Sequence, residues 1–166
     1  MATADRELKV ETRGDLETVM TRQFDAPRDL VFEAHSSCEH MSKWWGPRRY
    51  EVDQCEVDFR EGGKWRMVHR SPEGGPEFGF HGEYLEIVRP EKITWTFEFE
   101  GAPGHVAVET VTLEEHDGVT TLTAVSRADT KESRDAVMES GMVDGARETW
   151  ERLQEHLDEM KVQAAS

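Results

Sequence analysis

The alternation of apolar and polar residues is clearest at positions 93–100, where Ile, Trp, Phe and Phe alternate with Thr, Thr, Glu and Glu. A period of two is typical of a β-strand with one buried face and one face in water. Weaker alternation predicts six more strands, at 16–24, 50–59, 64–69, 78–88, 106–113 and 119–126. Near Asp53-Gln54 the apolar phase changes within one strand, which indicates a β-bulge.

Turn signals separate the later strands. Gly62-Gly63, the segments 71–76 and 101–104, and Asp117-Gly118 all contain glycine. Such short connections are typical of hairpins, and Asp-Gly is a particularly strong hairpin signal. We therefore expect an antiparallel sheet.

Two short helices are predicted between the first strand and the second. Asp25 can cap the first helix, with Pro27 in its first turn. Ser36 and Ser37 break that helix and can cap the next one, whose apolar face carries Met41, Trp44 and Trp45. Gly46-Pro47 then ends the second helix, because glycine accepts the left-handed cap and proline cannot continue a helix.

The pattern changes from a period of two to a spacing of three or four residues between 133 and 160. This spacing predicts one long amphipathic helix. Its apolar positions are Met142, Ala146, Trp150, Leu153, Leu157 and Met160. Gly141 and Gly145 lie inside it, where glycine lowers helix stability. They indicate either tight packing against the sheet, or a kink or open space beside a cavity.

The order of elements is strand, two helices, six strands and a long helix, which is typical of an α+β fold with helices on one face of a sheet. Long antiparallel strands twist and curl, so a cleft is expected between the sheet and the long helix. We expect a flexible lead-in at 1–15, a single domain at 16–160 and a tail at 161–166.

Charge and composition narrow the functional classes. The net charge is −15, and 33% of residues are charged. Nucleic-acid binding is not expected, because it needs clustered lysine and arginine. No apolar run is long enough to span a membrane and no signal peptide is visible, so we expect a cytoplasmic protein. Cys38 and Cys55 lack metal-ligand spacing and are expected to be reduced, buried thiols.

The histidines are the main candidates for chemistry. His35 and His40 lie on different helices, and no paired-cysteine or HExxH pattern occurs, so neither a metal nor a cofactor is expected. His69 is in phase with Trp65 and Met67 and can either face the cleft as a general base or lie at the surface. Among the carboxylates, Glu86 is a candidate partner for such a base. No serine or cysteine nucleophile motif is present.

Several short segments together resemble one protein family. They are Phe24-Asp25-Ala26-Pro27, Trp44-Trp45-Gly46-Pro47, Gly62-Gly63-Lys64-Trp65, residues 82–87, Pro90-Glu91-Lys92-Ile93, and Gly141-Met142 with Gly145 and Leu153. In this order they resemble the START-like (SRPBCC) superfamily, within it the single-domain homologues of the activator of heat-shock-protein-90 ATPase. The resemblance implies the helix-grip fold, as in the birch-pollen allergen: a curved antiparallel sheet with two short helices and a long C-terminal helix.

The resemblance also implies a function. Most of the superfamily bind hydrophobic small molecules between sheet and helix, so we expect a non-enzymatic binder of a hydrophobic or aromatic ligand. The expected cavity residues are Trp44, Trp45, Tyr50, Trp65, Met67, His69, Phe80, Trp95, Phe97, Met138, Met142 and Trp150. One alternative is a cavity enzyme of the cyclase or dehydratase type that uses a cleft histidine or glutamate. Another is a stress-response or cochaperone-like interaction module.

The family name further implies a chaperone partner. However, the chain resembles only the second domain of the eukaryotic activator, and the Asn- and Trp-rich contact segment of the first domain has no counterpart here. This difference counts against a chaperone partner. For the assembly we expect a monomer or a weak homodimer.

Overall fold

In the computed structural model, which describes residues 5–165, eight strands form one antiparallel sheet in the order β1-β2-β8-β7-β6-β5-β4-β3. The strands are β1 (Lys9–Arg13), β2 (Glu17–Phe24), β3 (Glu51–Val57), β4 (Lys64–Arg70), β5 (Phe78–Val88), β6 (Lys92–Phe99), β7 (Val106–His116) and β8 (Val119–Arg127). All seven predicted strands are present. The predicted bulge is confirmed by a register shift between Val52 and Gln54.

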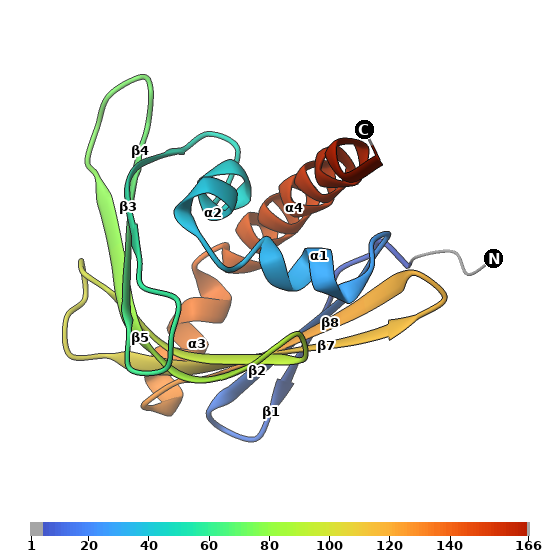
Figure 1. The fold of residues 1–166 in the computed structure, drawn as a ribbon. Helices are drawn as coiled ribbons and strands as arrows, with labels where there is room; N and C mark the ends of the chain where they lie inside the picture. Colours follow the sequence, from blue (N-terminus) through green and yellow to red (C-terminus); the bar gives the residue numbers. More distant parts are fainter. Residues whose placement is uncertain (1–4, 166) are drawn as a thin grey trace.

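The helices are α1 (Arg28–Glu33), α2 (Cys38–Trp44), α3 (Lys131–Glu139) and α4 (Met142–Ala165). Figure 1 shows a strongly curved sheet with α1, α2 and α4 on its concave side. This is the expected helix-grip architecture. No described helix is long and apolar enough to cross a membrane.

The expected terminal segments differ from the structure. Within the lead-in expected at 1–15, β1 pairs with β2, and Leu8 is buried. Charged neighbours interrupt the short apolar pattern of β1, so the sequence gives little sign of it. At the other end, α4 continues through 161–165, where a tail was expected. Residues 1–4 and 166 of these two segments lie outside the described residues.

The helix caps are only partly as predicted. Ser37 caps α2, and its hydroxyl accepts a hydrogen bond from the His40 N–H at 3.4 Å. The expected cap at Asp25 is wrong, because Pro27 occupies the N-cap position of α1 and no side chain caps that helix. The Asp25 carboxylate instead forms ion pairs with Arg6 and Lys161.

The long helix predicted over 133–160 is broken. α3 ends at Glu139 and α4 begins at Met142, with Gly141 at a φ of +84° between them. A Cβ on Gly141 would meet nothing within 4 Å, so this glycine marks a kink and does not serve tight packing. At Gly145 a Cβ would lie 3.5 Å from the Pro47 Cγ, which is an ordinary packing distance.

A disulfide joins Cys38 to Cys55, with their Cα atoms 5.8 Å apart. The expectation of two reduced thiols is therefore wrong in this structure. The cysteines lie 17 residues apart, and only the packing of α2 against β3 brings them together. The bond ties the first turn of α2 to the sheet.

The core lies between the concave face of the sheet and the helices. Its fully buried side chains include Phe24, Val31, Phe32, Ile93, Leu113, Leu122, Leu153 and Leu157. Trp150 of α4 packs edge-on against Phe24, with ring centroids 5.9 Å apart. The predicted inward face of the last helix is thus present at Trp150 and Leu153, while Met142 and Ala146 are half-buried.

Candidate ligand-binding site

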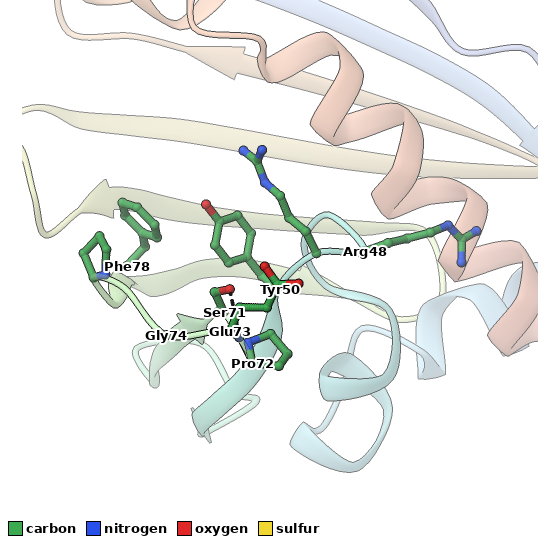
Figure 2. Close-up of a pocket in the computed structure, with 9 residues that line it drawn as sticks. Arg48, Tyr50, Ser71, Pro72, Glu73, Gly74 and Phe78 are labelled. Atoms are coloured by element: carbon green, nitrogen blue, oxygen red, sulfur yellow. Dashed lines mark hydrogen bonds between the residues drawn. The ribbon is translucent and has the colours of Figure 1, made fainter.

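An open cleft of about 450 Å³ lies between residues 48–50, which follow α2, and the loop that joins β4 to β5. It is lined by Arg48, Arg49, Tyr50, Ser71, Pro72, Glu73, Gly74, Pro76 and Phe78. Figure 2 shows Tyr50 beside Phe78, while Arg48 extends toward the helix behind it. We call this space the outer cleft.

The two arginines of the outer cleft differ in their surroundings. Arg48 donates from Nη1 to the Glu155 carboxylate at 3.1 Å, and its backbone N–H donates to Glu148 at the same distance. Arg49 places its guanidinium 5.0 Å from the centre of the Tyr50 ring. Among the described residues Arg49 has no carboxylate partner, so its charge remains available at the cleft.

A continuous chain of aromatic rings leads inward from the outer cleft. Tyr50 stacks on His69 with centroids 6.3 Å apart, and His69 lies 5.1 Å from Phe80. Phe80 then lies 5.4 Å from Phe97, and Phe97 lies 5.8 Å from Trp65. The rings come from three strands and the segment before β3, and they form one apolar wall.

This wall ends at a small internal space, the inner void, of about 10 Å³. It is lined by His35, Met41, Trp45, Trp65, Tyr84 and Trp95. A space of this size holds about one water molecule. The Trp95 side chain is 5% exposed, and its Nε1–H has no hydrogen-bond partner among the described residues.

The structure places the expected cavity residues in several surroundings. Tyr50 lines the outer cleft, and Trp45, Trp65 and Trp95 line the inner void. His69, Phe80 and Phe97 connect these two spaces through the ring contacts given above. The remaining residues, Trp44, Met67, Met138, Met142 and Trp150, line neither space.

Three of these remaining residues have evident packing roles. Trp44 is buried and donates its Nε1–H to the Ala34 carbonyl at 2.9 Å. Met138 of α3 lies near β2, with its sulfur 3.8 Å from the Thr18 hydroxyl. Trp150 packs in the core against Phe24 of β2. As a group, the expected residues remain a proposed site.

Two histidines are buried in the interior, and neither has a carboxylate partner among the described residues. His35 is 3% exposed, with its Nδ1 at 2.7 Å from the Val31 carbonyl. His69 is 4% exposed, and its Nε2 has no described hydrogen-bond partner. Burial lowers the pKa of each to about 4, helped at His69 by Arg152. Both rings are therefore neutral near pH 7.

The family of this chain follows from its similarity to known proteins. The sequence profile described as "Activator of Hsp90 ATPase homolog 1-like protein" matches residues 25–158. The chain belongs to this family. No curated protein matches this chain.

Solved structures share the fold of this family member. A protein from Rhodobacter sphaeroides is 24% identical, with a TM-score of 0.84 over 92% of this chain and 99% of its own. A protein from Nitrosomonas europaea is 27% identical, with a TM-score of 0.79 over 90% and 99%. A Silicibacter pomeroyi protein named for the same family is 20% identical, with a TM-score of 0.71 over 86% and 97%.

Two residues of this family member were missed in the sequence. Arg152 of α4 donates to the carbonyl of Gly46 at 2.8 Å and to that of Lys43 at 3.1 Å. It thereby satisfies carbonyl groups at the end of α2 and fixes the segment that carries Trp45. No local pattern predicts this contact, because it depends on how α4 crosses α2.

The second missed residue is Glu109. Glu109 is directly opposite Trp95 in the β6–β7 register, so both side chains project to the concave face. Burial raises the pKa of its carboxyl to about 7. A sequence signal was available, since Glu109 is in phase with the core residues Val111 and Leu113.

Proposed function

We propose that this protein binds a hydrophobic or aromatic small molecule between the sheet and the helices, without catalysing a reaction on it. The observation that carries the proposal is the continuous aromatic wall between the outer cleft of about 450 Å³ and the inner void. Open clefts lined by aromatic side chains with a few polar groups are typical ligand sites. On this view the ligand enters by the outer cleft.

Entry to the interior requires a side chain to move, because the inner void holds only about one water. Trp45 is the side chain best placed to do so. It is half-buried, lies just beyond the end of α2 and contacts Trp65 with centroids 5.8 Å apart. Gly46 follows it at a φ of +91°, a conformation that glycine adopts without strain. We propose Trp45 as the gate.

Burial of apolar surface is a sufficient driving force. A ligand with two aromatic rings buries about 200 Å² of surface, and at about 25 cal/mol per Å² this favours binding by about 5 kcal/mol. Binding of this kind is expected to persist at high salt, since salt screens exposed charges and leaves apolar burial intact.

The alternatives receive less support from the geometry. A cavity enzyme would be favoured by an interior histidine with a carboxylate partner, and neither His35 nor His69 has one among the described residues. An interaction module would be favoured by one large exposed apolar patch. The exposed large apolar residues are instead spread over several elements: Leu85, Val88, Val106, Val108, Val137 and Val162.

The test is titration with the neutral fluorescent probe N-phenyl-1-naphthylamine, in low salt and in 1 M NaCl. We expect a dissociation constant of about 0.2 mM in both, as a binding free energy of about 5 kcal/mol gives. We expect Trp45→Ala to speed association about tenfold in stopped-flow measurements, because a factor of ten corresponds to a change of only about 1.4 kcal/mol in the barrier. Val162→Ala, at an exposed position of α4, is the matched control and should leave the rate unchanged. Absence of binding below about 1 mM, the range of very weak complexes, would contradict the proposal.

A further inference from the structure

A row of side chains that carry polar atoms crosses the concave face. Thr18 of β2, Ser126 of β8, Glu109 of β7, Trp95 of β6 and Tyr84 of β5 are successive cross-strand partners. Directly paired residues project to the same face, with Cβ atoms about 5 Å apart. The next row toward the core is apolar and contains Ala124, Val111 and Ile93.

Two neighbours in this row have unused hydrogen-bonding capacity. The Trp95 indole N–H lines the inner void and has no described partner. The Glu109 side chain forms no hydrogen bond or ion pair with any described residue, and burial alone raises its pKa to about 7. Buried polar groups in native proteins nearly always have partners, so a buried, unpaired indole N–H requires an explanation, and the carboxyl beside it is half-buried and also without a described partner.

The rest of the row does not supply the missing partner. The Thr18 hydroxyl points toward the Met138 sulfur at 3.8 Å. Across the inner void, His35 commits its Nδ1 to the Val31 carbonyl. The indole donor and the carboxyl acceptor therefore remain free to meet a bound molecule.

The chemistry of the pair restricts that molecule. A carboxylate ligand would be repelled by an ionised Glu109, and an ammonium group has no lone pair to accept from the indole N–H. A hydroxyl satisfies both, because its oxygen accepts from Trp95 while its hydrogen is donated to Glu109. A water molecule in the inner void, which Trp95 lines and Glu109 does not, can accept from the indole N–H until a ligand displaces it.

We propose that Trp95 and Glu109 form a polar anchor that selects apolar or aromatic ligands carrying a hydroxyl group. This inference rests on the proposed ligand-binding function and specifies its ligand class. The ring system would occupy the aromatic wall, and the hydroxyl would lie at the polar row. Discrimination between ligands then comes from the two groups that lack partners in the unliganded protein.

The test compares 2-naphthol with 2-methylnaphthalene, which differ only in a hydroxyl and a methyl group, by isothermal titration calorimetry. We expect the wild-type protein to prefer 2-naphthol about tenfold, as one net hydrogen bond would give. Glu109→Leu and Trp95→Phe should each reduce this ratio to about one. Glu114→Leu, on the opposite face of β7, is the matched control and should retain the tenfold ratio.

Three other outcomes of this experiment would each overturn the proposed anchor. Equal affinities in the wild-type protein would overturn the anchor and leave the ligand-binding function standing. A preference that survives in both Glu109→Leu and Trp95→Phe would show that the hydroxyl is recognised elsewhere, which also overturns the anchor. If neither compound binds, the proposed function fails and the anchor fails with it. Thermal unfolding of each variant confirms that the comparison is made on folded protein.

Discussion

The two ends of the concave face are built from the same strands and yet differ in packing. At one end the inner positions are fully covered by α1 and α4, and 0–2% of each is exposed. These positions are Ile93, Val111, Leu113, Leu122 and Ala124. At the other end the inner positions Phe97, Ala107, Glu109 and Ser126 are all only half-buried.

Within one sheet, the packed end serves stability and the half-covered end is the one available for ligand recognition. The packed end is apolar and closely covered, as is typical of a core that stabilises the fold. The half-covered end holds the aromatic wall, of which Trp65 and His69 are themselves buried, and the groups of Glu109 and Trp95 that have no described partner. Proteins commonly tolerate such local costs at functional sites.

The largest expected effect contrasts one aromatic residue from each end. Trp150→Ala should lower the free energy of unfolding by about 4 kcal/mol, because it removes a buried ring that packs on Phe24. Phe97→Ala should cost less than about 2 kcal/mol, since its surroundings are already partly open. Urea unfolding of both variants measures the contrast. Equal losses would show that the two ends are packed alike.

The second-largest expected effect on stability comes from the disulfide, because it links α2 to the sheet at the half-covered end. Breaking the link between Cys38 and Cys55, 17 residues apart, should lower the unfolding free energy by about 3 kcal/mol. Urea unfolding with and without dithiothreitol measures this loss. The variant with both cysteines changed to serine should match the reduced protein and ignore the reductant. Identical midpoints for oxidised and reduced wild-type protein would contradict the prediction.

The smallest effect concerns pH at Glu109. Its pKa is raised from 4.5 to about 7 in the folded protein, so its contribution to stability is present below pH 4.5 and is lost as the pH rises through 7. Glu109→Gln does not titrate. The free energy of unfolding of this variant, relative to that of the wild-type protein, should therefore be about 2 kcal/mol higher at pH 8 than at pH 4. Urea unfolding at the two pH values measures the change. A constant difference between the proteins would show that the carboxyl is not desolvated.

These features differ in how far the sequence could predict them. The alternation at 93–100, the bulge near Asp53 and the Asp117-Gly118 hairpin are local signals, and the structure contains all three elements. The packing of distant segments was not predictable in the same way. The Cys38–Cys55 pairing and the Arg152 contacts with the end of α2 arise only when the helices come to lie on the sheet.

The candidate site was predicted less completely than the fold. Aromatic composition and the family resemblance indicated Trp45, Trp65 and Trp95, which do lie together around the inner void. Glu109 carried a signal in its phase with Val111, but a glutamate in a strand is usually assigned to the solvent face. Only the register of β6 with β7 places it beside Trp95.

The most direct test of the account is a nuclear magnetic resonance titration that follows the indole N–H signals of the five tryptophans. With 2-naphthol as the ligand, the signals of Trp45, Trp65 and Trp95 should shift, while that of Trp150 in the packed core should stay in place. Shifts confined to Trp150, or no shift at any tryptophan up to about 1 mM ligand, would contradict a binding site at the half-covered end of the sheet.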